Sequence, residues 1–215
     1  PWYYESNTNY VKERKFNSGI PKEFIYTSRE TFNWGYYPED TKMQKRIADD
    51  FVTQYEKFKE KGKGLYVYTK ISGSGKTMLA CCLANEIIER YGSVVKFCSV
   101  TDYLNVITEK SSEGKEQIES FKKCGLLILD DIGVQTEKKE WVSAALFDLI
   151  DERYRNLRPT IYTSNLEMEE ASSNERLRSR IYRSSVPIVL PEFSVRKKLA
   201  DKEMMEFMKS LRKEN

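Results

Sequence analysis

Short apolar runs alternate with longer amphipathic stretches along most of this sequence. The clearest run, Leu126-Leu127-Ile128-Leu129, is apolar throughout. Continuous apolarity is typical of a parallel strand that is buried on both faces of a sheet. Similar runs predict four further strands, at residues 65–69, 94–100, 160–163 and 186–190.

Helical periodicity fills the segments between these runs. In residues 41–61, apolar side chains recur at spacings of three and four and form one buried stripe: Met43, Ile47, Phe51, Tyr55 and Phe58. Further helices are predicted at 76–91, 101–124 (with a polar break at 111–114), 139–157, 174–183 and 196–215. Strands that alternate with helices predict an α/β fold, with a five-stranded parallel sheet and right-handed crossovers.

The two ends of the chain differ from this pattern. Residues 1–40 are rich in Tyr, Asn, Gly and Pro without sustained periodicity, which predicts an extended arm with short turns. We therefore divide the chain into an N-terminal arm or linker (1–40), a main domain (41–195) and a C-terminal helical tail (196–215). The first residue is Pro rather than Met, which suggests a trimmed chain or a fragment.

Composition narrows the class of protein. The 215 residues carry a net charge of only +3, so any surface that binds nucleic acid must be local. The absence of histidine excludes histidine-dependent triads and zinc–histidine sites. The four cysteines lie in apolar runs without metal spacing, which favours buried free thiols in a reducing cytoplasm over disulfides. No apolar run is long enough to span a membrane, so no membrane partner is expected.

A phosphate-binding motif follows the first predicted strand. The turn after that strand and the first residues of the next helix are Gly73, Ser74, Gly75, Lys76, Thr77 and Met78. In this context the backbone N–H groups and the helix N-terminus face a polyphosphate, Lys76 adds a charge, and the Thr77 hydroxyl ligates Mg²⁺. The full motif has glycine six residues before the lysine, where this chain has Lys70. The glycines alone would also suit a flexible turn.

Polar side chains end two of the other strands. Asp130 and Asp131 follow the third strand, and Asn165 follows the fourth. Ligands of open α/β sheets bind beyond the carboxyl ends of the strands, so these residues are expected near the phosphate loop. Asp130 would hold Mg²⁺, Asp131 would act on the attacking water, and Asn165 would bind that water or the γ-phosphate. Each of them alone is also common in turns and caps.

Arginines crowd the helix at 174–183. Arg176 and Arg180 share a face, from which one of them could reach the γ-phosphate of a neighbouring subunit. A solvated, charged helix face explains most such runs equally well. Arg196, past the last strand, would sense the phosphates of its own subunit or form an ordinary ion pair.

Several stretches carry a family resemblance when taken in order. They are residues 18–21 (SGIP), the Gly-Ser-Gly-Lys-Thr loop with 79–86, 126–137 (LLILDDIGVQTE), 158–165, 174–180 and 193–196 (FSVR). With these motifs the chain resembles the bacterial replicative-helicase loaders, the DnaC/DnaI group of AAA+ ATPases, and the related transposon-associated IstB ATPases. The resemblance implies a P-loop NTPase of the AAA+ type with strand order 5-1-4-3-2 and no large lid domain.

The resemblance also implies a function and roles for single residues. The family delivers a hexameric replicative helicase onto single-stranded DNA under the control of ATP and Mg²⁺. Lys76 and Thr77 match the Walker A pair, and Asp130 and Asp131 the Walker B pair. The remaining matches are Asn165 with sensor 1, Arg176 and Arg180 with the arginine-finger motif, and Arg196 with a sensor-2-like arginine. We expect a cytoplasmic, weak ATPase that self-associates through these arginines.

Three departures from the family pattern leave alternatives open. Lys70 replaces a glycine that permits a tight turn, which predicts retained but weaker nucleotide binding. Asp131 stands where many relatives have Glu, and its shorter arm suits a slow switch. The loaders' separate N-terminal helicase-binding domain is expected to be absent or removed. A transposition helper ATPase that binds duplex DNA, or an adaptor with impaired nucleotide binding, remain the alternatives.

Overall fold

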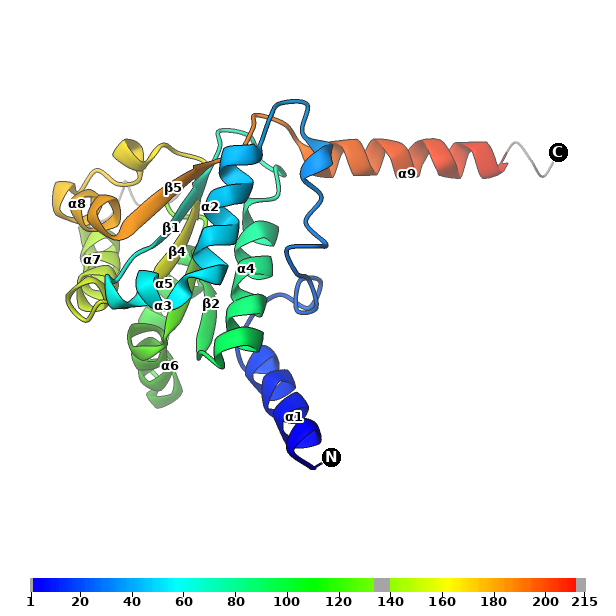
Figure 1. The fold of residues 1–215 in the computed structure, drawn as a ribbon. Coiled ribbons are helices and arrows are strands. Elements are labelled where there is room, and N and C mark those ends of the chain that lie inside the picture. Colours follow the sequence, from blue (N-terminus) through cyan, green and yellow to red (C-terminus); the bar gives the residue numbers. More distant parts are fainter. Residues whose placement is uncertain (1, 134–139, 212–215) are drawn as a thin grey trace.

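A five-stranded parallel sheet forms the centre of the molecule (Figure 1), whose computed structural model describes residues 2–133 and 140–211. The strands are β1 (Gly64–Tyr68), β2 (Val95–Ser99), β3 (Leu126–Asp130), β4 (Thr160–Ser164) and β5 (Ser185–Val189). Their order is β2-β3-β4-β1-β5, and every neighbouring pair is parallel. Read from the other edge, this is 5-1-4-3-2, so the predicted fold is confirmed.

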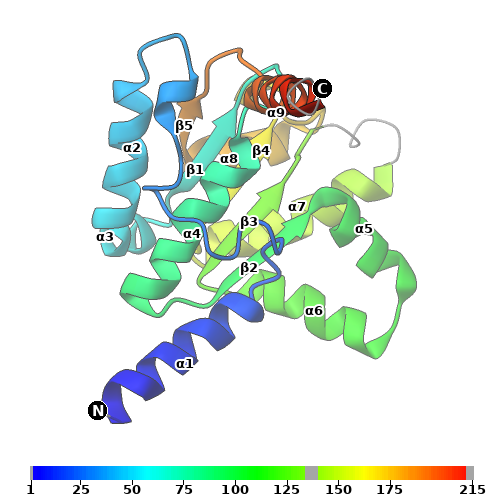
Figure 2. The same ribbon diagram turned by 90° about the vertical axis from the view of Figure 1, so that its right-hand side faces the viewer.

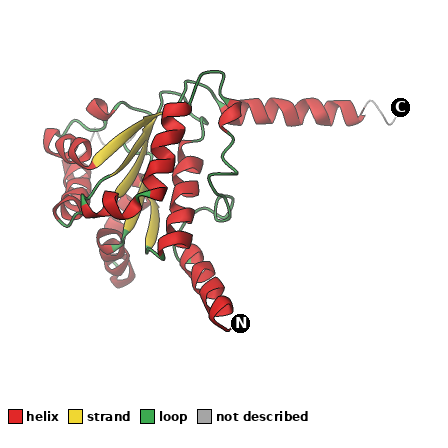
Figure 3. Ribbon diagram, in the orientation of Figure 1, coloured by secondary structure: helices red, strands yellow, loops and turns green. Residues whose placement is uncertain are grey.

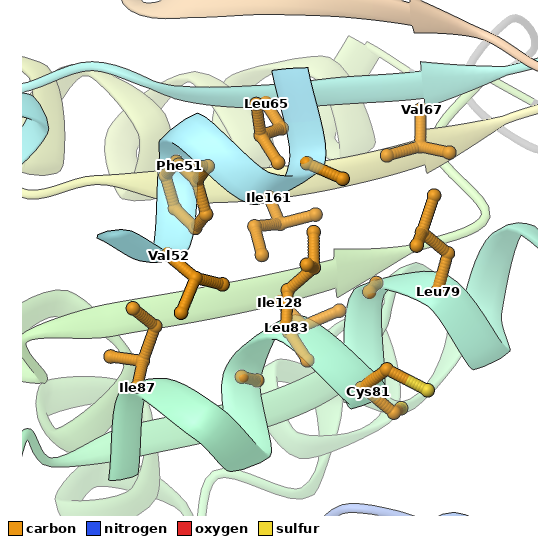
Figure 4. Packing of buried hydrophobic residues seen from close by; sticks show 14 of the residues in the cluster. Phe51, Val52, Leu65, Val67, Leu79, Cys81, Leu83, Ile87, Ile128 and Ile161 are labelled. Carbon is orange, nitrogen blue, oxygen red and sulfur yellow. The ribbon is translucent and has the colours of Figure 1, made fainter. Parts of the chain in front are cut away.

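One face of the sheet is covered by α2 (Lys42–Thr53), α3 (Tyr55–Glu60) and α4 (Lys76–Tyr91). Side chains alternate along the strands, so Leu65 and Val67 point to this face while Tyr66 points to the other. Figure 4 shows how the strand residues pack against Phe51 of α2 and Leu83 of α4. Burial of these apolar side chains is the main stabilising contribution to this layer.

The opposite face is covered by four further helices (Figure 2). They are α5 (Val100–Glu109), α6 (Ser112–Lys123), α7 (Glu140–Arg155) and α8 (Glu175–Ser184). Arg153 of α7 is fully buried there and donates hydrogen bonds to the carbonyl oxygens of Phe121, Cys124 and Pro159 and to the Thr160 hydroxyl. These bonds satisfy the buried guanidinium group, and they join α6, α7 and β4.

Most predicted elements lie within a few residues of their observed bounds. The helix predicted at 41–61 is two helices, α2 and α3, separated by Gln54. In the described part of the chain, β5 is followed by the single helix α9 (Val195–Leu211), which projects from the body of the molecule (Figure 3). The predicted helix start at 139, the end of the motif at 134–137 and the last four residues lie outside the described residues.

The prediction of an extended arm for residues 1–40 is wrong in its first part. Residues Trp2–Phe16 form a helix, α1, which lies against α4, and Lys15 pairs with Glu89 of α4 at 2.6 Å. The sequence of this helix has no stripe of apolar residues at helical spacing, which is the pattern by which helices are recognised.

The segment after α1 is held against the body of the protein. The Asn85 amide of α4 donates to the carbonyl oxygens of Phe24 and Thr27, both at 2.8 Å. Arg29 pairs with Glu86 of α4 at 2.9 Å and with Asp49 of α2 at 2.7 Å. These contacts carry the chain to a 3₁₀ turn, η1 (Trp34–Tyr36), beside the phosphate loop.

Two expectations from composition also have outcomes here. All four cysteines are free and buried, as predicted, and burial raises the pKa of Cys98 to about 12. None of the helices in the described ranges has both the length and the apolarity needed to cross a membrane.

Candidate nucleotide-binding site

The phosphate loop joins the end of β1 to the start of α4. Gly73 and Gly75 have φ angles of +74° and +97°, in the left-handed region that side chains with a Cβ rarely adopt. A Cβ on Gly73 would lie 2.9 Å from the Cβ of Arg196, so the loop and the start of α9 are in close contact. Two left-handed glycines curl the backbone before the N-terminus of α4, which is the geometry that cradles phosphate.

Lys76 is buried at the first position of α4. Its ammonium group donates to the carbonyl oxygen of Ile71 at 3.0 Å and to the Ser74 hydroxyl at 3.4 Å, so it lies within the curve of the loop. Burial lowers the pKa of Lys76, while the charges of Asp131 and Asp130 oppose that shift. The lysine therefore lies where a phosphate oxygen would replace its contacts with the loop.

Thr77 and Asp130 meet at the carboxyl edge of the sheet. The Thr77 hydroxyl donates to Asp130 Oδ1 at 2.9 Å, and the Thr163 hydroxyl of β4 donates to the same oxygen at 2.6 Å. Burial raises the pKa of Asp130, and the two hydroxyl bonds act in the opposite direction. The predicted metal pair thus lies together, and Thr163 is a partner that was not predicted.

This pair fits a magnesium ion that shares its ligands with a nucleotide. Mg²⁺ usually takes one or two protein oxygens, with water and phosphate oxygens completing its octahedron. In the described ranges, no group of three or more His, Cys, Asp or Glu side chains is placed to hold a metal. Phosphate and water would therefore supply the remaining ligands of an ion at Thr77 and Asp130.

Asp131 and Asn165 lie beside this pair. Asp131 has a φ of +64°, which turns its exposed side chain away from the line of β3, and its N–H donates to the Thr163 hydroxyl at 2.9 Å. The Asn165 amide donates to Asp131 Oδ1 at 3.4 Å. Asn165 Oδ1 is shielded from solvent and has no hydrogen-bond partner among the described residues. An orphaned buried acceptor fits an additional donor at this position, such as a water molecule.

Lys70 is accommodated without backbone strain. Among the described residues, positive φ angles occur at three residues other than glycine, namely Lys110, Asp131 and Leu157, and Lys70 is not one of them. Its ammonium group pairs with Glu167 at 3.1 Å, and this hydrogen bond and charge raise the pKa of Lys70. The loop therefore keeps its curved form with lysine in the place of the leading glycine.

An aromatic cluster against the loop was missed in the sequence. The Tyr37 hydroxyl donates to the carbonyl oxygen of Ser74 at 2.5 Å, and Phe32 and Trp34 pack edge to face at 4.7 Å. Phe32 and Trp34 also line a pocket of about 440 Å³, together with Leu79 of α4 and residues of α2. The sequence does contain an aromatic-rich stretch at 31–37, but its position beside the loop depends on long-range packing and could not be predicted from it.

The predicted arginines fall into two groups. The backbone N–H of Arg196 donates to the carbonyl oxygen of Gly73 at 3.0 Å, so Arg196 lies at the loop of its own chain. Arg176 and Arg180 are on α8, on the opposite side of the sheet from α4 (Figure 1), and do not join this site within one copy. Arg180 pairs with Asp151 at 2.7 Å and stacks over Tyr154, whereas Arg176 is exposed.

Met78 completes the set of predicted residues. Its half-buried side chain packs against the core between α4 and the sheet. This side chain therefore contributes to the packing of the core beside the loop.

The fold and this site define a P-loop nucleotide-binding protein of the AAA+ type. Comparison with known families gives the narrower group: residues 63–174 match the IstB-like ATP binding protein family, about half of the chain. The chain belongs to that family.

Individual relatives agree with the resemblance to the DnaC/DnaI group. The replicative helicase loader DnaI of Bacillus subtilis (strain 168) is 32% identical over 177 residues, which cover 78% of this chain and 55% of DnaI. The replicative helicase loader DnaC of Escherichia coli (strain K12) is 30% identical over 122 residues, 54% of this chain and 49% of DnaC. The chain thus spans about half the length of these relatives.

A solved structure gives the same result. The crystal structure of DnaI superposes with a TM-score of 0.66 at 26% identity, over 80% of this chain and 95% of that one. The predicted resemblance is therefore confirmed at the level of sequence and of fold.

Proposed function

We propose that this chain is the ATPase part of a replicative-helicase loader, which delivers a hexameric helicase onto single-stranded DNA as a slow ATP switch. The observation that carries the proposal is the assembled cluster of Lys76, Thr77 and Asp130 at the curved loop. The similarity to DnaI and DnaC supports the loader role.

Each residue of the cluster has a task in this proposal. The loop and Lys76 bind the phosphates of ATP, and Thr77 and Asp130 hold Mg²⁺, which would neutralise charge on the phosphates. Asp131 and Asn165, whose amide donates to Asp131 Oδ1 at 3.4 Å, orient the attacking water. The pocket lined by Phe32 and Trp34 takes the base, because aromatic faces stack well on nucleobases.

The slow rate follows from the same geometry. Asp131 is exposed, and its short side chain leaves a water near it less restrained than a buried base would. A neighbouring copy would add an arginine that stabilises the transition state. We assign this role to Arg176 or Arg180 of α8.

Replacing Lys76 tests nucleotide binding. We expect Lys76→Ala to weaken ATP·Mg²⁺ binding by about 10- to 100-fold, because charge-assisted hydrogen bonds contribute roughly 1.5–3 kcal/mol. Isothermal titration calorimetry measures this loss, with Lys42→Ala, an exposed lysine of α2, as the matched control. Equal affinities of the two variants would contradict the assignment of the loop.

Arg176 and Arg180 differ in their surroundings. Arg176 is exposed, while Arg180 is engaged by Asp151 and Tyr154, so we expect Arg176→Ala to reduce ATP hydrolysis without affecting ATP binding. Arg180→Ala should lower stability by about 1 kcal/mol and change hydrolysis less. The measurements are steady-state hydrolysis at high protein concentration and thermal unfolding. The opposite ranking in hydrolysis would assign the role to Arg180.

The loader role is tested with its two partners. The expected result is ATP-dependent binding of labelled single-stranded DNA and of a hexameric replicative helicase, both lost in Lys76→Ala. A chain that binds ATP but neither partner would refute the loader role and leave the nucleotide site intact.

The family match favours one second candidate, a transposition helper ATPase. That function predicts preference for duplex over single-stranded DNA and binding to a transposase. Competition between the two forms of DNA in one anisotropy assay distinguishes the candidates. Submicromolar ATP binding would exclude the third alternative, an adaptor that does not bind nucleotide.

A further inference from the structure

Two successive carbonyl oxygens of the phosphate loop accept hydrogen bonds from outside the loop. The Gly73 carbonyl oxygen accepts from the backbone N–H of Arg196 at 3.0 Å, and the Ser74 carbonyl oxygen accepts from the Tyr37 hydroxyl at 2.5 Å. The first bond uses a backbone donor, which every residue except proline has. The second uses a side chain from 37 positions away, so it depends on the identity of that residue.

The bond from Tyr37 fixes the orientation of the peptide between Ser74 and Gly75. This peptide is trans, so its carbonyl oxygen and its N–H point in opposite directions. Because the carbonyl oxygen is turned toward Tyr37, the Gly75 N–H is turned away from Tyr37, into the curve of the loop that holds the Lys76 ammonium group. Backbone N–H groups that face one concave surface are the donors by which such loops bind phosphate.

The loop sequence alone does not select this orientation. A peptide turns over by rotation about ψ of the residue before it and φ of the residue after it. The residue after this peptide is Gly75, which has a φ of +97°. Glycine adopts positive and negative φ about equally well, so the Ser74–Gly75 peptide can turn over at little steric cost. A donor outside the loop therefore decides which way the Gly75 N–H points.

Tyr37 is itself held in a fixed position. Its side chain is 7% exposed, and its ring lies beside those of Phe32 and Trp34, with centroids 6.3 Å from each. The segment that carries it runs along α4 (Figure 1) and is bonded there through Arg29 and Glu86. Burial raises the pKa of Tyr37, so its hydroxyl keeps its proton and remains a donor.

The contact between this aromatic cluster and the loop is close. A Cβ on Gly75 would lie 3.2 Å from the Tyr37 hydroxyl and 3.2 Å from Cε2 of Phe32. The hydroxyl therefore lies directly against the peptide that it bonds, and no water molecule fits between the two.

We propose that Tyr37 is a positioning residue of the phosphate site, whose hydroxyl holds the Ser74–Gly75 peptide with the Gly75 N–H facing the phosphates of the nucleotide. Because the peptide is already oriented in the free protein, binding does not have to order it, which raises affinity. The effect acts on the phosphates and is independent of the base. The inference rests on the proposed function in one respect, namely that this loop binds the phosphates of ATP.

Tyr37→Phe tests the proposal, because it removes the hydroxyl and keeps the ring. We expect it to weaken binding of ATP·Mg²⁺ by about 5- to 10-fold in isothermal titration calorimetry. Inorganic tripolyphosphate with Mg²⁺ should lose affinity by the same factor, since it has phosphates but no base. Tyr55→Phe is the matched control: its buried hydroxyl also donates to a backbone carbonyl, that of Gly125 at 3.3 Å, at the amino end of β3. The control should bind both ligands as the wild-type chain does.

The amide signal of Gly75 gives a readout that a loss of stability would not change. In two-dimensional ¹H–¹⁵N NMR of the nucleotide-free wild-type chain, we expect one sharp signal for Gly75. In Tyr37→Phe this signal should broaden or double, because the peptide exchanges between two orientations. Gly92, which also has a positive φ and lies at the other end of α4, should keep its signal.

Four outcomes would overturn the inference. Wild-type affinity for ATP in Tyr37→Phe, or an unchanged Gly75 signal, would do so and leave the proposed function standing. A loss of affinity for ATP without a loss for tripolyphosphate would assign Tyr37 to the base instead. An equal loss in Tyr55→Phe would show a general effect of stability. If the wild-type chain binds neither ligand, the proposed function is refuted and the inference with it.

Discussion

Two helices start at the phosphate loop, and they differ in how much of their surface the rest of the chain covers. Helix α4 begins at Lys76 and buries nearly every side chain from Leu79 to Ile88 between the sheet, α2 and the N-terminal segment. Helix α9 begins at Val195, is bonded to Gly73 through Arg196, and leaves its side chains exposed from Lys202 to Lys209. The loop thus joins α4, which is buried in the core, and contacts α9, which lies on the surface.

This difference in burial means that α4 contributes more to stability, whereas α9 is more easily displaced. Displacing α4 would expose the apolar cluster that joins it to β1, β3 and β4, so the helix is a fixed base for Lys76 and Thr77. Displacing α9 exposes little, because little of it is covered. We therefore expect a movement of the loop to displace α9 more easily than α4.

The largest expected effect comes from shortening one side chain in each of the two helices. Leu83→Ala removes a fully buried side chain of α4 and should lower the free energy of unfolding by about 2–5 kcal/mol. Met204→Ala removes a similar volume from α9 and should change it by no more than about 0.5 kcal/mol. Urea denaturation of dilute protein measures both. Equal losses would remove the distinction between the two helices.

A smaller effect is expected at Gly73, where the loop touches α9. Gly73→Ala places a Cβ 2.9 Å from that of Arg196 on a backbone with φ +74°, and should destabilise the protein by about 1–3 kcal/mol and weaken ATP binding. Gly92→Ala is the matched control, since it has φ +58° but a nearest neighbour at 3.8 Å. Equal ATP affinities in both variants would show that the contact with α9 does not support the loop.

The smallest effect concerns pH. Burial tends to raise the pKa of Glu86 of α4, but hydrogen bonds and charge from Arg29 outweigh it and lower the pKa below its ordinary value of 4.5. The stabilisation is therefore complete above about pH 4.5 and is lost as pH falls through the lowered pKa. Glu86→Gln should flatten the acid side of the stability curve, whereas Glu206→Gln, in an exposed pair of α9, should not. Identical acid slopes in Glu86→Gln and wild type would contradict this reading.

The sequence predicted those parts of the site that depend on local pattern. The strands coincide with short segments rich in apolar or β-branched residues, and residues at the carboxyl ends of neighbouring parallel strands lie at the same edge of the sheet. Thr77 and Asp130, with Asn165 beside Asp131, accordingly lie at the same edge of the sheet, and their roles toward a nucleotide stay predictions. Lys76 and the two left-handed glycines follow from the motif alone.

Features that depend on packing between distant segments were missed. Tyr37 reaches Ser74 across 37 positions, and the helix α1 has no apolar stripe to reveal it. Thr163 was counted only as part of a strand, although its hydroxyl joins Asp130 and the N–H of Asp131. The backbone at Lys70 does not have a positive φ, so the loop does not require glycine there, whereas the weaker nucleotide binding expected from Lys70 stays a prediction.

The contact between Gly73 and Arg196 also has a mechanical consequence. Helix α9 has 17 residues, so at about 1.5 Å per residue it is a rod about 25 Å long, held at one end. A tilt of about 10° at the loop would carry its far end through about 4 Å. A small rotation at the phosphate loop would therefore produce a much larger displacement at the far end of α9.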